Sequence, residues 1–223
     1  MNIMDAIKQR HSVRSYTDAK LPLEVISQLQ TEIMKSNRES GLHIQLVTEE
    51  TKAFDGFMAH YGKFSGVRNY IALIGKKSPT LDETIGYYGE HIALFAQTLG
   101  LNTCWVAMTV RKGTTKEYCK IQAGEKLVCV LALGYGKTQG SQHKNKAVEE
   151  VCAAGGEAPD WFLRGVEAAL LAPTATNQQK FMLSLDGRHV TAKSTGGFYS
   201  KVDLGIVKYH FEAAAGTENF TWK

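Results

Sequence analysis

A chain of 223 residues, 43% hydrophobic and 22% charged, has the size and composition of a globular protein that can bury a sizeable core. Its formal net charge of +4 is spread along the sequence without a basic stripe interleaved with aromatic residues, so we expect no nucleic-acid partner. No apolar run approaches the roughly 20 residues of a membrane span, which argues against a membrane protein. The N-terminus lacks the apolar block of a signal peptide, and we therefore expect a cytoplasmic protein.

The hydrophobic pattern predicts helices and strands in mixed order. Apolar residues typical of helices fill three segments, at residues 2–10, 22–36 and 87–99. Alternating or β-branched apolar runs predict four strands, at residues 43–48, 69–74, 104–110 and 127–133. Strands mixed with long helices favour an α+β or α/β architecture.

The cysteines and histidines give no sign of a metal site. The cysteines form no CxxC pair and stand mostly among apolar residues, as small core side chains do in a reducing compartment. They are Cys104, Cys119, Cys129 and Cys152. The seven histidines are scattered without metal-ligand spacing, so we expect no bound metal.

The second half of the chain repeats part of the first. Displacing the sequence by 137 positions aligns residues 22–49 with residues 159–186 without a gap, and it places Pro22 on Pro159. The apolar positions that coincide are Leu29 with Val166, Ile33 with Leu170, Ile44 with Phe181 and Leu46 with Leu183.

A second match, at a different displacement, pairs two apolar helices that each end in glycine. Residues 89–100 align with residues 205–216, and a tryptophan follows each segment shortly. Because few residues are identical, chance similarity between amphipathic helices stays an alternative. The shared order of helix, strand and glycine-ended helix favours an internal duplication. The polar stretch at 137–146 and the glycine-rich stretch at 153–157 suit flexible connections between the copies.

The N-terminal segment at residues 10–16 concentrates positive charge and hydroxyl groups. Arg10 and Arg14 flank Ser12, and a guanidinium offers a planar fork of donors that keeps its charge when partly buried. This pattern suits a phosphate. The alternative is that the segment is helical, in which case residues four apart simply share a solvated face.

A downstream segment, residues 172–179, reads Ala-Pro-Thr-Ala-Thr-Asn-Gln-Gln. Its small and amide side chains suit a loop that lies against a planar ring and forms hydrogen bonds with the ring edge. Asn177 could also cap a helix or turn, as asparagine commonly does. The neighbouring Pro173 and Gln179 favour the ring-binding interpretation.

These two segments resemble the paired motifs of the nitroreductase family of FMN-dependent oxidoreductases. That family implies an intertwined α+β homodimer that binds FMN at its interface, with an Arg/Ser-rich motif from one subunit and an Ala-Pro-Ser-Ala-x-Asn-x-Gln loop from the other. The resemblance implies a phosphate-binding motif made of Arg10, His11, Ser12 and Arg14, in which we do not expect the histidine to be catalytic. It implies ring contacts from Pro173, Thr174 (in place of the family's serine), Ala175 and Asn177.

Two further stretches resemble family segments. Residues 99–108 are similar to the stretch whose backbone passes the reactive edge of the isoalloxazine ring. The similarity implies that Trp105 and Val106 shape the wall, and that Ala107 or Met108 donates a main-chain N–H to flavin N5. We expect no catalytic side chain, because the flavin carries the chemistry.

A basic pair and an acidic residue complete the candidate positions. Lys144 and Lys146 resemble the family's downstream basic pair that binds the phosphate, although they fit a solvated loop equally well. Asp203 stands near the start of the C-terminal helix, where an acidic side chain complements the helix dipole, and we interpret it as structural.

Each copy keeps only one of the two motifs. The first copy should carry the ring-contacting loop at residues 35–42, but that stretch has lost the proline and most of the pattern. The second copy shows no Arg-x-Ser-x-Arg before Pro159. The chain therefore resembles a subgroup of nitroreductase-like proteins with an internally duplicated single chain, which implies a pseudo-dimer with one composite FMN site. We expect a nitroreductase-like lobe at residues 1–146 and a truncated repeat lobe at residues 147–223 that completes the site.

The resemblance implies that electrons pass from NAD(P)H or another donor through FMN to a nitroaromatic, quinone or similar small-molecule acceptor. The alternative is a protein that binds FMN for storage or redox sensing without turnover. No dinucleotide fingerprint follows a strand, so the sequence does not choose the donor. We expect an acceptor pocket built from residues 50–68 and 187–200, and a pseudo-dimer that can work as a monomer.

Overall fold

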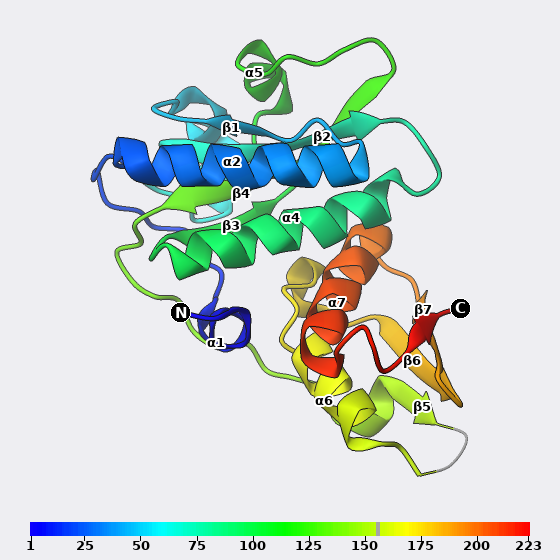
Figure 1. Cartoon of the computed structure of the whole chain (residues 1–223). Helices are drawn as coiled ribbons and strands as arrows, with labels where there is room; N and C mark the ends of the chain where they lie inside the picture. Colours follow the sequence, from blue (N-terminus) through cyan, green and yellow to red (C-terminus); the bar gives the residue numbers. More distant parts are fainter. Residues whose placement is uncertain (155–156) are drawn as a thin grey trace. The chain divides into compact units, whose positions relative to one another are not determined.

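The computed structural model describes residues 1–154 and 157–223, and helices and strands are mixed along the chain (Figure 1). The helices are α1 (Ile3–Gln9), α2 (Leu23–Ser40), α3 (Phe57–Tyr61), α4 (Leu81–Thr98), α5 (Lys112–Glu117), α6 (Asp160–Ala169) and α7 (Ser200–Ala215). The strands are β1 (Gln45–Val47), β2 (Asn69–Lys76), β3 (Asn102–Val106), β4 (Glu125–Gly134), β5 (Cys152–Ala154), β6 (Phe181–Asp186), β7 (His189–Ser194) and β8 (Thr221–Trp222). Short 3₁₀ turns lie at Lys52–Phe54, Val148–Glu150 and Ala175–Asn177. This mixture confirms the predicted α+β class.

The chain forms two compact units, and neither is one continuous stretch. The central unit comprises Gln9–Leu81 and Ile92–Ser141. The terminal unit comprises Met1–Lys8, Asp82–His91 and Gln142–Lys223. Each unit has a four-stranded sheet of its own.

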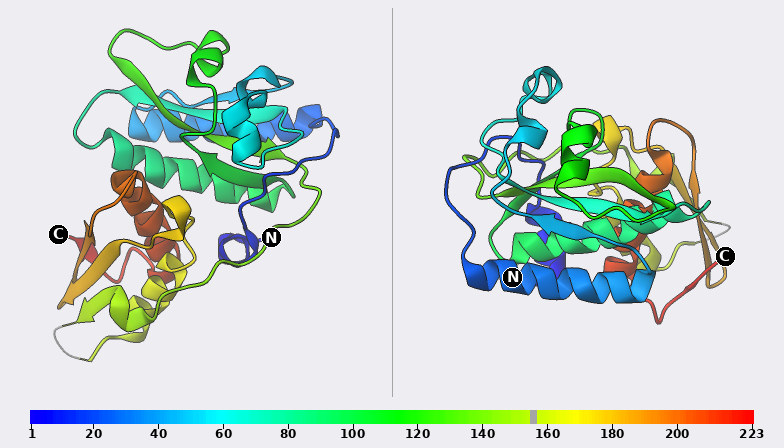
Figure 2. Two further views of the ribbon diagram at one scale, coloured as in Figure 1. Left: turned by 180° about the vertical axis from the view of Figure 1, so that it is seen from behind. Right: turned by 90° about the horizontal axis from the view of Figure 1, so that it is seen from above.

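The sheet of the central unit has the strand order β1-β2-β4-β3, and every neighbouring pair is antiparallel. Strands β2 and β4 are buried along almost their whole length, which explains their nearly continuous apolar sequences. One face carries Tyr70, Ala72 and Ala132, which share a core cluster with Phe54 and Phe64. Helix α2 lies on the opposite face (Figure 2).

Helix α2 has clear start and stop signals. It follows Pro22, and a proline is tolerated there because the first N–H groups of a helix have no partner inside the helix. Leu29 and Ile33, one turn apart, are buried on the face that meets the sheet. The helix ends at Gly41, whose φ of 69° is a left-handed conformation that suits glycine.

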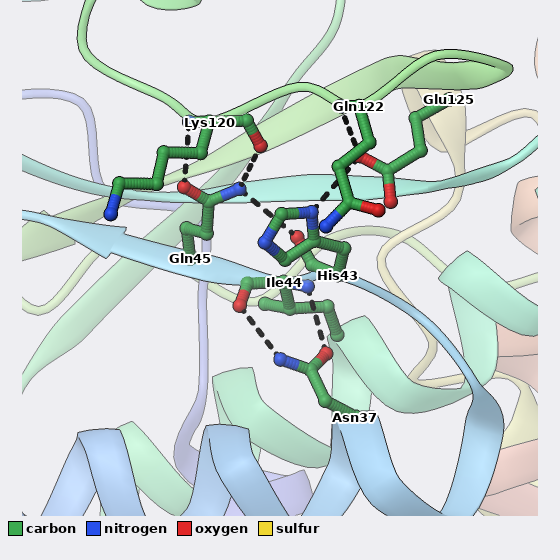
Figure 3. Close-up of polar contacts among 7 residues, drawn as sticks. All are labelled: Asn37, His43, Ile44, Gln45, Lys120, Gln122 and Glu125. Carbon is green, nitrogen blue, oxygen red and sulfur yellow. Dashed lines mark hydrogen bonds and ion pairs between the residues drawn. The ribbon is translucent and has the colours of Figure 1, made fainter.

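Side-chain amides hold the short edge strand β1 on both sides (Figure 3). The Asn37 amide donates to the Ile44 carbonyl at 2.9 Å and accepts from the Ile44 N–H at 2.8 Å, which ties the end of α2 to the strand. On the other side, Gln45 makes the same two-way pair with the Lys120 backbone, at 2.8 and 2.9 Å. These brackets fix the register of a strand with only three paired residues.

An imidazole–carboxylate pair adds to the same network. His43 Nδ1 lies 2.9 Å from Glu125 Oε2, which also accepts the Gln122 N–H at 2.7 Å (Figure 3). Burial raises the pKa of Glu125, but the hydrogen bonds from His43 and Gln122 outweigh burial and hold that pKa below its usual value.

The sheet of the terminal unit has the order β5-β6-β7-β8. Strands β6 and β7 form an antiparallel hairpin, while β5 and β8 pair in parallel on its two sides. Helices α6 and α7 pack together, and aromatic rings fill the core. The rings in mutual contact are Trp161, Phe162, Phe211, Phe220 and Trp222.

Within the terminal unit, the first turns of α4 cross α7 at a pair of glycines. A Cβ atom on Gly86 would lie 2.0 Å from the Val202 carbonyl oxygen, and one on Gly205 would lie 2.0 Å from the Glu83 carbonyl oxygen. Larger residues would therefore push the two helices apart.

The same helices share a wholly buried polar pair. His210 Nε2 lies 2.9 Å from Glu90 Oε1, and His210 Nδ1 lies 3.0 Å from the Ala168 carbonyl oxygen on α6. Because a carbonyl only accepts, Nδ1 carries a proton, and the histidine links all three helices.

The largest differences between the structure and the sequence prediction lie at three element boundaries. The helix predicted to end at residue 36 continues to Ser40, and the helix predicted from residue 87 begins at Leu81. The strand predicted at 104–110 is wrong beyond Val106, where pairing with β4 stops. At 153–157, Ala153 and Ala154 belong to β5, and Gly155 and Gly156 lie outside the described residues.

Among the described residues, no helix is both long and apolar enough to cross a membrane.

Candidate functional site

The Arg/Ser segment is an extended strand-like stretch and not a helix. It follows α1 and forms isolated parallel bridges from Ser12 to Thr103 and from Ser15 to Ser65. The Val13 N–H donates to the Thr103 carbonyl at 3.1 Å. The alternative in which two arginines share the solvated face of a helix is therefore wrong.

The buried Tyr16 pins the end of this segment. Its hydroxyl donates to the Val13 carbonyl at 2.7 Å, and its N–H donates to the Ser65 carbonyl at 2.9 Å. The ring is only 2% exposed. The backbone of residues 12–16 is thus fixed against three other segments of the central unit, around Thr103, Ser65 and Gly136.

The cationic side chains of the segment, Arg10 and Arg14, lie near Cys104 on β3. Arg10 is 3% exposed although it carries a charge, while Arg14 is exposed and its guanidinium carbon lies 6.0 Å from the centre of the Phe64 ring. Burial raises the pKa of Cys104, and Arg14, the Ser12 hydroxyl and Arg10 act in the opposite direction. Ser12 and both arginines therefore lie near enough to this thiol to influence its pKa.

The stretch predicted to pass the ring edge lies at the end of β3. Trp105 and Val106 are the last residues paired with β4, opposite Leu131 and Val130. Ala107 and Met108 follow the end of the ladder, and Met108 is 65% exposed. Residues 105–108 and the Arg/Ser segment therefore come together in the central unit, because Ser12 bridges to the strand that leads to them.

The remaining candidates belong to the terminal unit, where residues 173–179 form a loop between α6 and β6. Three of its residues, Thr176, Asn177 and Gln179, have φ angles of 51°, 55° and 45°. Residues with a Cβ rarely adopt this left-handed conformation, which persists only where the surroundings enforce it.

Gln179 is the centre of the bonds that enforce this conformation. Its buried amide donates to the Lys144 carbonyl and to Asn177 Oδ1, both at 2.9 Å, and accepts the Lys146 N–H at 2.9 Å. Its own N–H donates to the Thr174 hydroxyl at 3.0 Å. Segments more than 30 residues apart in the sequence are thereby joined.

The predicted basic pair takes part in this junction. The Asn177 amide donates to the Lys144 carbonyl at 2.8 Å, so Lys144 contributes its backbone, and its side chain is exposed. The Lys146 ammonium donates to the Gln179 carbonyl at 2.9 Å. Lys146 therefore has a structural role in holding the loop.

Asp203 holds the other side of the loop. It lies in the first turn of α7, as expected, but its carboxylate accepts the Ala175 N–H at 2.9 Å and the Gln178 amide at 2.6 Å. Burial raises the pKa of Asp203 to about 6, against the opposing effect of these two bonds. The interpretation that it complements the dipole of α7 is therefore incomplete.

The central unit also has a cavity of about 730 Å³ beside the Arg/Ser segment. Phe54 and Phe64 supply aromatic walls, and the charged residues of the lining are Arg68 and Lys137 together with Asp18 and Asp55. Arg68 is paired with Glu49 at 2.6 Å. Phe64 is the ring next to Arg14, so the cavity adjoins the cationic segment. Residues 51–68 contribute much of its lining, which is one of the two stretches from which we expect the acceptor pocket to be built. The other, residues 187–200, belongs to the terminal unit and does not line this cavity.

Sequence reasoning missed the residues that position these segments. Nothing in the sequence marks Thr103 and Ser65 as the backbone partners of the Arg/Ser segment, because such contacts depend on the sheet. The final glutamine of the Asn-Gln-Gln run was a visible signal for Gln179, but the loop pattern does not show that its amide bonds the Lys144 and Lys146 backbones.

Comparisons with known proteins agree with this geometry. A family model described as "Putative TM nitroreductase" matches residues 2–215. A putative nitroreductase of Thermotoga maritima has a TM-score of 0.67 at 24% identity, covering 96% of this chain and 83% of that chain. A putative NADH dehydrogenase/NAD(P)H nitroreductase of Bacteroides thetaiotaomicron has a TM-score of 0.54 at 22% identity, covering 67% and 95%.

A third solved structure, a putative nitroreductase of Desulfovibrio desulfuricans in complex with FMN, has a TM-score of 0.54 at 17% identity and covers 68% of this chain and 95% of that one. At these identities the solved structures establish a common fold. No match was found among curated proteins. The family model spans nearly the whole sequence. The chain therefore belongs to the putative TM nitroreductase family, which gives it the general role of an oxidoreductase.

Proposed function

We propose that this protein binds one FMN per chain and uses it to pass electrons from a reduced nicotinamide or another donor to a nitroaromatic, quinone or similar small acceptor. The observation that carries the proposal is the extended Arg/Ser segment, whose backbone is held against Thr103 and Ser65 and which carries two arginines beside a cavity. The FMN complex of the Desulfovibrio relative and the NAD(P)H in the name of the Bacteroides relative support the cofactor and the donor.

The donor set of the central unit fits a phosphate. A phosphate monoester carries close to two negative charges at neutral pH. Arg10 and Arg14 supply two positive charges, and Ser12 supplies a hydroxyl between them. Backbone hydrogen bonds hold this segment, so little conformational entropy is lost when the ligand binds.

The loop of the terminal unit fits the edge and face of a flavin ring. Pro173 and Ala175 are small enough to lie against a planar surface, and Asn177 keeps one amide hydrogen beyond its bond to the Lys144 carbonyl. Thr174 is buried and supports the loop from within, where its hydroxyl accepts the Gln179 N–H. The bonds from Gln179 and Asp203 fix the backbone in advance. A loop that is fixed before the ligand binds can place its hydrogen-bond donors without reorganising during the reaction.

FMN, when bound, supplies the hydride and electron transfer, and the chain supplies position and electrostatics. The N–H groups of Ala107 and Met108 lie beyond the β3–β4 ladder, where we propose that one of them donates to the reactive ring edge. Aromatic acceptors would stack against Phe54 and Phe64 in the cavity of the central unit.

Flavin content and turnover test the proposal together. We expect the purified protein to show a flavin absorption spectrum and to oxidise NADH or NADPH when a nitroaromatic or quinone is added. Bound FMN without turnover would support the storage or redox-sensing alternative. A colourless protein that takes up no added FMN would contradict the proposal.

Two distant substitutions test whether the two motifs serve one site. Arg10→Ala and Asn177→Ala should each weaken FMN binding about 10- to 100-fold, the range expected for losing a hydrogen bond to a charged or buried group. Arg38→Ala and Asn145→Ala are matched controls at exposed positions and should leave binding unchanged. Because Arg10 is buried, Arg10→Lys separates loss of charge from loss of packing. An effect from only one of the two motifs would contradict the shared site.

A further inference from the structure

Asp203 is a buried carboxylate whose bonds go to the candidate flavin loop. It is 6% exposed, and its two oxygens accept from different parts of the loop, Oδ1 from the Ala175 N–H at 2.9 Å and Oδ2 from Gln178 Nε2 at 2.6 Å. A buried carboxylate is unfavourable unless charge-assisted hydrogen bonds compensate for the lost water. The two hydrogen bonds from the loop therefore compensate Asp203 for part of its lost hydration.

The Gln178 amide extends the contact. Its Nε2 also donates to the Phe198 carbonyl at 2.8 Å, so both of its hydrogens are used. The carboxylate, the amide and the backbone of residues 198 and 175 form one bonded set around the start of α7. Gln178 lies between two of the left-handed residues, Asn177 and Gln179. The bond from Gln178 to Asp203 thus stabilises the backbone between two residues in the left-handed conformation.

The protonation state of Asp203 sets how many hydrogen bonds its carboxyl group can accept from the loop. The ionised carboxylate accepts from both donors at once. A protonated carboxyl turns one oxygen into a donor that faces an N–H group, so one of the two bonds is lost. Burial raises the pKa of Asp203 to about 6, which puts this change near neutral pH.

The ionisable groups on the neighbouring elements carry both signs of charge. Lys201 on α7, Lys180 just before β6, and Lys144 and Lys146 beside the loop are cationic. Asp82 and Glu83 are acidic and lie in the first turn of α4, which packs against α7 at Gly205, and Tyr199 directly precedes α7. The causes of the shift in the pKa of Asp203 are burial, the Gln178 bond and the Ala175 bond, and these lysines are not among them. The titration is therefore governed by burial and by the loop itself.

We propose that Asp203 is a positioning residue for the flavin: its carboxylate holds Ala175 and Gln178 in the ring-contacting conformation, and its protonation loosens the loop and weakens flavin binding. This inference rests on the proposed function. It adds a residue outside both sequence motifs and a dependence of cofactor affinity on acidity.

The test compares the FMN dissociation constant of the wild type and Asp203→Asn between pH 5 and pH 8, by quenching of flavin fluorescence. We expect the variant to bind about tenfold more weakly at pH 8, since a hydrogen bond to a charged group is lost. The two proteins should approach each other at pH 5. The phosphate of FMN itself titrates near pH 6, so the readout is the ratio of the two constants and not either one alone.

Asp160→Asn is the matched control. Asp160 is also an acidic residue in the first turn of a helix of the terminal unit, but it is exposed. Its substitution should leave the ratio near one at every pH. A ratio for Asp203→Asn that stays constant across the range would overturn the inference, even if the variant bound less tightly.

A second readout needs no flavin. Hydrogen exchange at the Ala175 amide, corrected for the intrinsic rate, should be slow in the wild type at pH 8 and faster at pH 5, and fast throughout in Asp203→Ala, which has no side-chain acceptor for this N–H. If the wild type binds no FMN, the proposed function fails, and so does the flavin part of this inference. The exchange result then tests only the contact between Asp203 and the loop.

If Asp203→Asn does not fold, Gln178→Met removes one of the two bonds, and it should weaken FMN binding less than tenfold. An Ala175 amide equally protected in folded variants and wild type would contradict the positioning role.

Discussion

Residues 22–49 and 159–186 begin alike and then diverge. Both start with a proline that precedes a helix, Pro22 with ψ 148° and Pro159 with ψ 153°. Both reach a strand of their own sheet, β1 and β6. In the first region the helix runs for 18 residues, whereas in the second it stops after 10.

Position 173 explains where the two regions part. Pro173 aligns with Ser36, which is buried inside α2. A proline lacks the N–H that continues a helix, and it disfavours helical conformation in the residue before it. The second region therefore forms a loop, which Gln179 and Asp203 then fix. One proline and a few amide side chains thus convert a helix end into a candidate cofactor loop. The internal duplication itself stays a prediction.

The largest expected effect comes from moving the proline. Ser36→Pro should destabilise the protein by about 3 kcal/mol or more, because it removes a helix hydrogen bond and clashes with the preceding turn. Pro173→Ala should change stability by less than about 1 kcal/mol, since the loop is held by other bonds. Urea unfolding of both variants measures the difference. Equal losses of unfolding free energy in the two variants would contradict the claim that the proline makes the two regions differ.

Removing the centre of the loop should have the next largest effect. Gln179→Ala deletes the bonds to the Lys144 carbonyl and the Lys146 N–H, and it should cost about 1–3 kcal/mol through unsatisfied buried groups. We also expect weaker FMN binding. Gln142→Ala, at an exposed position of the same unit, is the control. Retained flavin affinity in the unstable variant would show that the loop conformation is irrelevant to the cofactor.

The smallest effect concerns acidity, and it has opposite signs in the two units. The lowered pKa of Glu125 means that its bonds stabilise the central unit above the unfolded pKa, and that this contribution is lost as the pH falls through the lower folded value. The raised pKa of Asp203 means that burying the ionised carboxylate costs more than its two loop bonds return. The net contribution of this group to the free energy of unfolding is therefore fully present below the unfolded pKa and is lost as the pH rises through about 6, even though the ionised form makes both loop bonds.

Thermal unfolding of two variants measures these signs. The difference between wild type and Glu125→Gln should shrink as the pH is lowered below about 4.5, the ordinary range of a glutamate. The stability of Asp203→Asn relative to wild type should rise between pH 4 and pH 7. The same direction of change in both variants would refute the assignment of burial as the dominant influence on Asp203.

The parts of the fold that the sequence predicted are those fixed by local pattern. The helix after Pro22 and the apolar strand at 69–74 follow from residues close in the chain. Strand β7 was missed because its residues are mostly polar or half-buried and lie between Gly187 and a glycine pair. The first turn of α4 was missed because its acidic residues hide the periodicity.

The same division holds for the candidate site. The Arg/Ser segment and the Pro-Thr-Ala-Thr-Asn loop were visible as local motifs. Their supports were not, because the bridge from Ser12 to Thr103 and the bonds from Asp203 to the loop join residues far apart in the sequence. Only the structure shows that the Lys146 ammonium donates a hydrogen bond to the Gln179 carbonyl.

The number of FMN molecules per polypeptide tests the central claim most directly. It is obtained from the visible absorbance of the purified, FMN-saturated protein, with the released flavin identified and the protein measured by amino-acid analysis. If only the second region carries the loop while the first continues as helix α2, one FMN should bind per chain. Two FMN per chain, or none, would contradict this account.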